Sequence, residues 1–396
     1  MSLLSGVYGR AARFRRAWYG RDPYRTRQLA QPVISVGNLV VGGSGKTPVV
    51  ATLARLLLAA GERPAILSRG YGRLRTADGV VVVSDVHQVL VPTTKSGDEP
   101  QMMARALPGV PVLVSPDRYL AGRVAERRFG CTVHLLDDGF QHLQLARDID
   151  LLVISKGDLD EVLLPSGRLR EPLDAAAAAD ALLVSGTEED ASSVCARLGI
   201  APVFRLMPRY DEPRLVEPFG VATPAPVVRR TVAVAGIARP ERFFAALRAE
   251  GWDVVEERVF RDHHWFTLRD LESIRRAAVD AKADVVLTTE KDAVRLDSLV
   301  GRALSGSPGG PEAPHRASPG GSVRGGDPAA EASPTGDREP VWAFLPMQIG
   351  IEPAPSFAAW ISDRLGAARD GPRQRTVQPA LAGRVAARPD PGGEAA

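Results

Sequence analysis

Short apolar runs alternate with longer amphipathic stretches over residues 32–206 of the chain. The runs are rich in Val, Ile and Leu, which is typical of buried strands, and several of the stretches between them have helical spacing. This alternation predicts βαβ units and a largely parallel sheet. Strands are expected at Val33–Val36, Ala65–Ser68, Val80–Val83, Val112–Val114, Val133–Leu136, Leu151–Ile154 and Leu182–Val184, with helices at Val49–Ala60 and Arg118–Phe129.

A second series of the same kind follows a Pro-rich stretch, residues 207–229, which we interpret as a linker. It predicts a smaller α/β domain over residues 230–366. Residues 301–339 are rich in Gly, Pro and Ser, so they bury too little surface to offset their ordering entropy and are expected to be a disordered insertion; the tail 367–396 is expected to be mobile. Strands are expected at Thr231–Ala235, Val254–Phe260, Val285–Thr288 and Val341–Leu345, and helices at Glu241–Glu250, Leu268–Ala281 and Ser356–Leu365.

The composition supports a globular protein of more than one domain. The chain has 396 residues, 44% of them apolar, and a net charge of only +3, which excludes a nucleic-acid-binding polycation. Two cysteines exclude a disulfide framework and a four-Cys zinc site, and they favour a reducing compartment. The chain has no run of 18 apolar residues, so no transmembrane helix is expected. The N-terminus also lacks the apolar core of a secretory signal.

Residues 1–28 differ from the rest, because they carry seven arginines, five aromatic side chains and a single acid, Asp22. Basic residues interleaved with aromatic residues suit the surface of an anionic membrane. A solvated helix that packs on the core through its aromatic residues explains the same composition equally well. Nucleic-acid binding is a weaker third interpretation, since no further basic cluster supports it.

The strongest motif lies in residues 33–50, between a predicted strand and a predicted helix, which is the setting of a phosphate-binding loop. Its glycines let backbone N–H groups approach a polyphosphate at a helix N-terminus. Lys46 would reach the outer phosphates and the Thr47 hydroxyl would ligate Mg²⁺, although Val40 stands where the usual pattern has glycine. Lysine is scarce in this chain, with only five occurrences, so Lys46 is a notable exception. The predicted nucleotide-binding residues are Gly42, Gly43, Ser44, Gly45, Lys46 and Thr47.

Acidic and histidine side chains form three further candidate groups. Asp137 and Asp138 end an apolar run, as on the Mg²⁺ side of a nucleotide enzyme, although a strand end followed by a turn gives the same pattern. Asp98 and Glu99 precede a helical stretch, which either of them could simply cap. His263 and the adjacent His264 could be general bases, metal ligands or turn residues, but two adjacent histidines cannot easily face one metal.

In combination, these motifs resemble the tetraacyldisaccharide 4′-kinases, the lipid A 4′-kinases. The matches occur in the family's order over nearly the whole chain, and the family also lacks the glycine at the position of Val40. The matching stretches are Val36–Pro48, Ser68–Arg73, Gly97–Pro100, Leu136–His142, Leu163–Pro172, Phe260–His263 and Thr288–Leu296.

The resemblance implies two α/β/α sandwich domains joined by a short β linker, the first domain having a parallel sheet like that of phosphate-loop NTPases. It implies ATP and Mg²⁺ as cofactors and transfer of the γ-phosphoryl group to the 4′-hydroxyl of a lipid A disaccharide precursor. Asp98 would be the base and His263 would orient it. Glu99, Asp137, Asp138 and Glu171 would lie near the metal. The segment 1–28 would dock on the cytoplasmic face of the bacterial inner membrane.

Two other functions remain open on the sequence alone. One is a phosphate-loop ATPase or GTPase that acts as a switch or metallochaperone, although a guanine-specific motif and clusters of metal-binding Cys or His are missing. The other is a cytosolic small-molecule kinase. The sequence indicates neither nucleic acid nor an obligate protein partner. It does not specify the acyl-chain preference, the oligomeric state or the role of the insertion.

Overall fold

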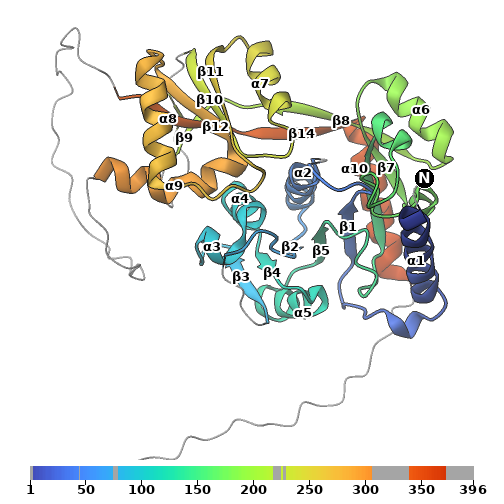
Figure 1. Ribbon diagram of the computed structural model, residues 1–396. Coiled ribbons are helices and arrows are strands. Elements are labelled where there is room, and N and C mark those ends of the chain that lie inside the picture. The colour runs from blue at the N-terminus through green and yellow to red at the C-terminus, as the bar shows by residue number, and fades with distance from the viewer. Residues whose placement is uncertain are drawn as a thin grey trace, which may run out of the picture.

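The computed structural model describes residues 3–43, 45–74, 79–216, 224–225, 229–305 and 339–371. Two β-sheets dominate it, each covered by helices (Figure 1). Alternate residues of a strand point to opposite faces, so Ile34 packs in one apolar cluster and Val33 in another, while Val232 and Ala233 divide in the same way in the second sheet. Both sheets are therefore buried on two faces, and the predicted α/β class is confirmed.

The larger sheet has nine strands in the order β14-β8-β7-β6-β1-β5-β2-β4-β3, and only the two edge strands run antiparallel to their neighbours. The strands are β1 (Val33–Gly37), β2 (Pro64–Ser68), β3 (Val81–Ser84), β4 (Val112–Val114), β5 (Val133–Asp137), β6 (Ile149–Ser155), β7 (Ala181–Ser185), β8 (Val203–Tyr210) and β14 (Met347–Glu352). The helices around this sheet are α1 (Leu3–Gly20), α2 (Lys46–Ala59), α3 (Thr93–Ser96), α4 (Asp98–Ala106), α5 (Arg118–Phe129), α6 (Glu188–Leu198) and α10 (Ala354–Asp370).

The smaller sheet has five strands in the order β11-β10-β12-β13-β9, and β9 is its antiparallel edge. Its strands are β9 (Arg214–Leu215), β10 (Arg230–Ala235), β11 (Asp253–Val259), β12 (Val285–Thr289) and β13 (Val341–Leu345), and its helices are α7 (Pro240–Ala249), α8 (Leu268–Asp280) and α9 (Glu290–Ser305). Three short 3₁₀ turns, η1 (Pro23–Arg25), η2 (Lys156–Asp160) and η3 (Leu173–Ala178), belong to the larger domain.

The prediction that the second domain covers residues 230–366 is wrong at its C-terminal boundary. After β13 the chain returns to the larger sheet, where β14 pairs with β8, and the two strands run side by side between the sheets (Figure 1). Ile349 and Ile351 face the core of the larger domain, and α10 buries Phe357 against the same cluster. The alternation in β14 is too short to show in the sequence which sheet the strand joins.

Two other boundaries also differ from the prediction. The predicted linker, residues 207–229, begins inside β8, because this strand continues to Tyr210. The predicted insertion, residues 301–339, begins inside α9, which runs to Ser305, and the predicted tail begins inside α10. The remainder of the insertion, residues 306–338, and residues 372–396 of the tail lie outside the described residues.

Helix α1 packs on the larger domain through small residues. Ser5 and Gly9 are buried, and the Ser5 hydroxyl donates to the carbonyl of Leu163 at 3.0 Å. A Cβ added to Gly9 would lie 2.7 Å from a Leu163 methyl carbon, so the absent side chain permits this close approach. The interpretation of a helix packed through its aromatic residues holds only in part. Tyr8 packs against the core and donates to the Arg170 carbonyl, whereas Phe14 is 66% exposed and Trp18 is 41% exposed.

Candidate active site

The phosphate loop joins β1 to α2 at the carboxyl edge of the larger sheet. Gly42 and Gly45 have φ angles of +103° and +78°, which side chains with a Cβ rarely adopt. Lys46, at the start of α2, donates to the Asn38 side-chain oxygen at 3.0 Å. Thr47 is nearly buried at the floor of the adjoining cleft. Ser44, which was also predicted to bind nucleotide, lies outside the described residues.

Asp137 ends β5, the strand next to β1 in the sheet, and Asp138 follows it. The Lys46 ammonium lies 3.4 Å from Asp138 Oδ1, and Arg170 donates to Asp138 Oδ2 at 2.7 Å. Asp137 is buried, and its Oδ2 accepts a hydrogen bond from the Ser68 hydroxyl at 3.2 Å. Its Oδ1 is buried without a hydrogen-bond partner in the described part of the chain.

The two carboxyl groups have opposite electrostatics. Burial, together with the negative charges of Glu99 and Asp138, raises the pKa of Asp137 to about 7. Burial also opposes the ionisation of Asp138, but Lys46 and Arg170 outweigh it and lower the pKa of that carboxyl. Asp138 is therefore paired with two basic side chains, whereas Asp137 forms no ion pair among the described residues and is only partly compensated by the charge of Lys46.

Asp98 and His263 come together from different domains. His263 Nδ1 lies 2.9 Å from Asp98 Oδ2, and the backbone N–H of Glu99 donates to Asp98 Oδ1 at 2.9 Å. His263 has a φ of +57°, a strained conformation for a residue with a side chain. Burial opposes the charge of Asp98, but the hydrogen bond from His263 and the nearby charges of Lys291 and Arg295 lower its pKa.

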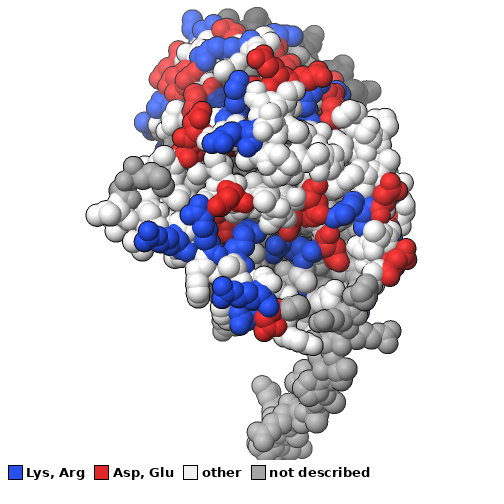
Figure 2. Space-filling view, turned by 90° about the vertical axis from the view of Figure 1, so that its right-hand side faces the viewer, with Lys and Arg blue, Asp and Glu red and all other residues white. Residues whose placement is uncertain are grey.

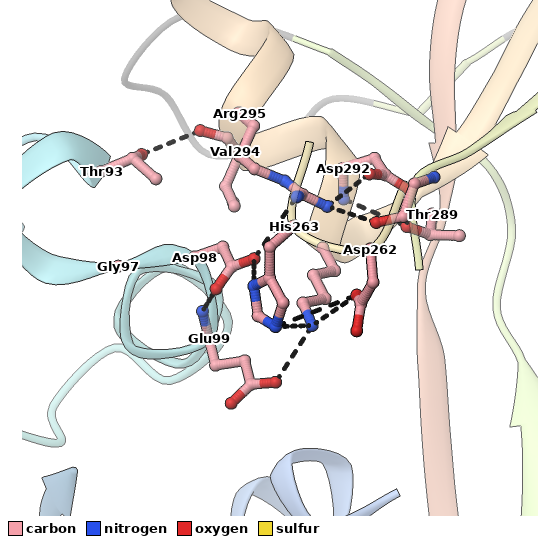
Figure 3. Close-up of polar contacts among 12 residues, drawn as sticks. Thr93, Gly97, Asp98, Glu99, Asp262, His263, Thr289, Asp292, Val294 and Arg295 are labelled. Atoms are coloured by element: carbon pink, nitrogen blue, oxygen red, sulfur yellow. Dashed lines mark hydrogen bonds and ion pairs between the residues drawn. The ribbon is translucent and has the colours of Figure 1, made fainter. Parts of the chain in front are cut away.

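This pair lies at the contact between α4 and α9. Thr93 donates a buried hydrogen bond to the Val294 carbonyl at 2.8 Å, and Arg295 Nη1 lies 3.7 Å from Asp98 Oδ2 (Figure 3). Figure 3 shows that Asp98 projects from α4 toward His263 and Arg295 of the smaller domain, while the Glu99 side chain points away from Arg295. The Asp98 carboxylate is thus enclosed by basic groups that all belong to the other domain.

Three further candidate residues of the sequence analysis have partners of their own. Glu171 is buried and bonds to Arg16 of α1 at 2.5 Å, so it ties the N-terminal helix to the cleft wall. Glu99 lies 3.2 Å from the Lys291 ammonium. His264 bonds to Asp270 at 3.1 Å beside the start of α8, which fits the turn-residue interpretation of this histidine.

A single cleft connects these groups. It has a volume of about 1570 Å³, and it is lined by the phosphate loop, Asp137 and Asp138 on one side and by His263 and Lys291 on the other. Arg239 and Arg242 of the smaller domain line it as well, and burial with the charge of Arg242 lowers the pKa of Arg239. Such a concentration of basic groups around a phosphate loop suits a polyanionic ligand.

Our sequence analysis missed Lys291, Arg170 and Arg239 as site residues. Lys291 carried a usable signal, because lysine is rare in the chain and this one lies in a matching motif, Thr288–Leu296. Arg170 also lies within a matching motif, next to Glu171. Arg239 carried no signal, since it is one of many arginines and reaches the cleft only through the placement of the second domain.

The geometry defines a class of protein: a phosphate-loop nucleotide enzyme with a carboxylate–imidazole pair across the cleft. Comparison with known proteins gives the family. A family model for tetraacyldisaccharide-1-P 4′-kinase matches residues 1–305. A tetraacyldisaccharide 4′-kinase of Geobacter metallireducens is 40% identical over 312 residues, or 76% of this chain and 89% of that protein. The homologue of Geobacter sulfurreducens is 40% identical over 77% of this chain and 86% of that protein.

A solved structure extends the comparison to three dimensions. The ATP complex of the "apo" form of LpxK from Aquifex aeolicus superposes with a TM-score of 0.67 at 29% sequence identity, covering 91% of this chain and 97% of that one. The chain therefore belongs to the tetraacyldisaccharide 4′-kinase family. It is an ATP-dependent kinase, and the switch ATPase or metallochaperone alternative is not favoured.

Proposed function

We propose that this protein transfers the γ-phosphoryl group of ATP to the 4′-hydroxyl of a tetraacyldisaccharide 1-phosphate. The observation that carries the proposal is the cleft in which a phosphate loop faces His263, whose imidazole bonds to Asp98 behind it, in a chain of the 4′-kinase family. Phosphoryl transfer passes through a loose transition state, so it depends on positioning and charge neutralisation more than on covalent chemistry. Both requirements can be assigned to residues of this cleft.

The phosphate loop would hold the nucleotide. Backbone N–H groups around Gly42, Gly43 and Gly45 would contact the phosphates, and the Lys46 ammonium would neutralise charge on the transferred group. Lys46 is held between Asn38 and Asp138 until the nucleotide arrives. Arg239 and Arg242 are placed to add positive charge from the smaller domain.

The residues beside Lys46 also fit a magnesium ion. Asp137 has a buried oxygen without a hydrogen-bond partner and an environment that disfavours an uncompensated charge, and both features are relieved by a cation. The Thr47 hydroxyl would be the second protein ligand. The described residues contain no group of three or more acidic, His or Cys side chains suited to a metal, so a bound ion would take further ligands from phosphates and water. Magnesium would supply charge neutralisation on the outer phosphates.

Asp98 would accept the proton of the attacking hydroxyl. Its Oδ2 faces the His263 imidazole, and within the described part of the chain its Oδ1 accepts only the backbone N–H of Glu99, so the carboxylate retains lone pairs for a proton. The 4′-oxygen would form a bond to the γ-phosphorus while the bond from that phosphorus to the bridging oxygen of ADP breaks. Asp98 lies behind His263 and is only 2% exposed, so the hydroxyl would reach it through movement of the cleft wall.

Helix α1 would hold the protein at the membrane that contains the acyl chains. Leu3, Val7, Phe14 and Trp18 are exposed at helical spacing, so they form an apolar stripe on α1. Arginines of the same helix flank the stripe, and basic side chains gather across the face of the molecule that carries α1 (Figure 2). No helix in the described residues is long and apolar enough to cross a membrane. We therefore propose peripheral docking on the cytoplasmic face of the inner membrane.

The decisive test is an assay of the purified chain with ATP, Mg²⁺ and a tetraacyldisaccharide 1-phosphate in mixed micelles, read by mass spectrometry. The expected product carries one added phosphate, and ADP forms in equal amount. A 4′-deoxy acceptor should give no phosphorylated product. ADP formation that is the same with and without acceptor would contradict the kinase proposal and favour an ATPase.

A further inference from the structure

Among the residues that the structure describes, Lys291 is the one basic side chain that lies against both the imidazole of the pair and Glu99, the acid next to Asp98. It is the second residue of α9, and its ammonium lies 3.1 Å from His263 Nε2 and 3.2 Å from Glu99 Oε1. Asp262 Oδ1 is 3.6 Å away. Its side chain is only 19% exposed, so these contacts are shielded from bulk water.

The contact with His263 fixes where the imidazole carries its proton. Burial opposes the charge of Lys291, but Glu99, Asp98 and Asp262 outweigh it and raise the pKa of the ammonium, which is therefore protonated. An ammonium group only donates hydrogen bonds, so Nε2 must offer a lone pair and carry no proton. The proton of the neutral ring then lies on Nδ1, where it is donated to Asp98 Oδ2.

We propose that Lys291 is a positioning residue that selects this tautomer and orientation of His263 and thereby keeps Asp98 an ionised hydrogen-bond acceptor. This deepens the proposed function, because Lys291 would act through the pair that takes the hydroxyl proton. Two polar groups at the imidazole favour this tautomer, namely Asp98 at Nδ1 and Lys291 at Nε2. The Asp262 carboxylate, 3.9 Å from Nε2, would favour a proton on Nε2 if the ammonium were removed.

The alternative role for Lys291 is a simple bridge between the domains. Its ion pair with Glu99 joins α9 to α4, but this contact does not stand alone, since Thr93 bonds to Val294 and Arg105 pairs with Asp297 across the same interface. Loss of Lys291 would thus leave the interface held by other contacts, while His263 Nε2 would lose its donor. The two roles can be separated by what happens to the imidazole.

The test uses the full-length protein labelled with ¹⁵N-histidine. The variant is Lys291→Met, which keeps a side chain of similar length but removes the ammonium that donates the hydrogen bond. In the wild type, His263 should show a protonated, pyrrole-like Nδ1 and an unprotonated, pyridine-like Nε2. In Lys291→Met the pyridine-like Nε2 signal should disappear, because Nε2 gains a proton. Lys291→Arg retains a donor and should preserve the signal. The His263→Ala spectrum identifies the resonances.

The kinetic arm asks whether Lys291 acts through His263. We expect Lys291→Met to lower kcat about 10- to 100-fold, with the KM for ATP within about twofold, because a misplaced catalytic group costs rate more than ground-state binding. In a His263→Ala background the same change should have little further effect. Lys282→Met, at an exposed lysine of the same domain, should match the wild type.

The outcomes that overturn the inference are distinct from failure of the proposed function. An unchanged His263 ¹⁵N pattern in Lys291→Met, or a wild-type pattern with the proton on Nε2, would refute the tautomer assignment. If Lys291→Met lowered kcat by the same factor in the His263→Ala background as in the wild type, Lys291 would act independently of the imidazole. The spectra require no turnover, so they test Lys291 even if the acceptor is a different one.

Discussion

The two sides of the cleft are built in different ways. On the phosphate side, Asn38, Lys46 and Thr47 lie within one strand–loop–helix unit, and Asp137 and Asp138 follow the adjacent strand. On the opposite side, the pair joins Asp98 to a histidine 165 positions further along the chain and in the other domain. The first arrangement is set by local structure, whereas the second exists only while the two domains keep their relative position. Binding and proton removal should therefore respond differently to substitution.

The largest loss of activity is expected from a substitution on the phosphate side of the cleft. Lys46→Ala should lower kcat by about 10²-fold or more, by analogy with loss of one charge-stabilising group in other enzymes. The melting temperature should change little, because Lys46 lies at a cleft surface. Lys95→Ala, at an exposed lysine of α3, is the matched control. A Lys46→Ala protein with near wild-type kcat would contradict the phosphate-loop assignment.

The buried carboxyl of Asp137, on the phosphate side of the cleft, should lower the stability of the ligand-free fold. The pKa of Asp137 is raised to about 7, against about 3.9 in an unfolded chain, so the unfolded state loses this proton first as the pH rises. The carboxyl therefore destabilises the ligand-free fold increasingly between about pH 4 and pH 7. Asp137→Asn should melt at a higher temperature than the wild type at pH 8, with the difference vanishing near pH 4, while kcat falls about 10-fold or more.

Asp138→Asn is the control, because its melting temperature should change in the opposite direction. The lowered pKa of Asp138 means that its carboxylate stabilises the fold above the unfolded pKa of about 4 and loses this effect as the pH falls through the folded value. The Asn variant should melt at a lower temperature than the wild type at pH 8. Equal melting shifts for the two variants would show that their environments do not differ as described.

Helix α1 lines the cleft through Tyr8 and Arg15, but its exposed apolar stripe lies outside the cleft lining. Changes in the stripe should therefore affect mainly membrane binding. Replacing Phe14 and Trp18 by Ser should weaken binding to anionic vesicles by about 10-fold or more, since each exposed aromatic side chain loses its burial in the bilayer. Activity on a detergent-dispersed acceptor should change little. Vesicle flotation measures the binding, and retention equal to that of the wild type would locate the docking surface elsewhere.

The smallest effect is expected at the domain interface. Thr93→Val removes the buried hydrogen bond to the Val294 carbonyl and leaves that acceptor unsatisfied, a cost of about 1 kcal/mol or somewhat more. If the Asp98–His263 pair depends on how α3 and the adjoining α4 are held against α9, kcat should fall about fivefold with an unchanged KM for ATP. A raised KM for ATP would indicate that the substitution disturbs the phosphate side instead.

The same contrast explains what the sequence could predict. Strand–loop–helix patterning indicated β1, α2 and the role of Lys46, because backbone geometry and motif lie in adjacent residues. The partner of Asp98 was inferred only through family resemblance, since a contact across 165 positions leaves no local pattern. Strand β14 was missed for a related reason: its apolar positions, Ile349 and Ile351, could pair with either sheet. Lys291 could have been singled out as a rare lysine in a matching motif, but its role could not be assigned before its neighbours were known.

The claim that the base is a unit assembled across two domains is tested most directly by a double-mutant cycle. The kcat values of the wild type, Asp98→Ala, His263→Ala and the double variant would be measured at saturating ATP and acceptor. Groups that act as one unit are strongly non-additive, so we predict that the double variant is little slower than the slower single variant. Losses that multiply fully in the double variant would show that Asp98 and His263 act independently and would contradict the account.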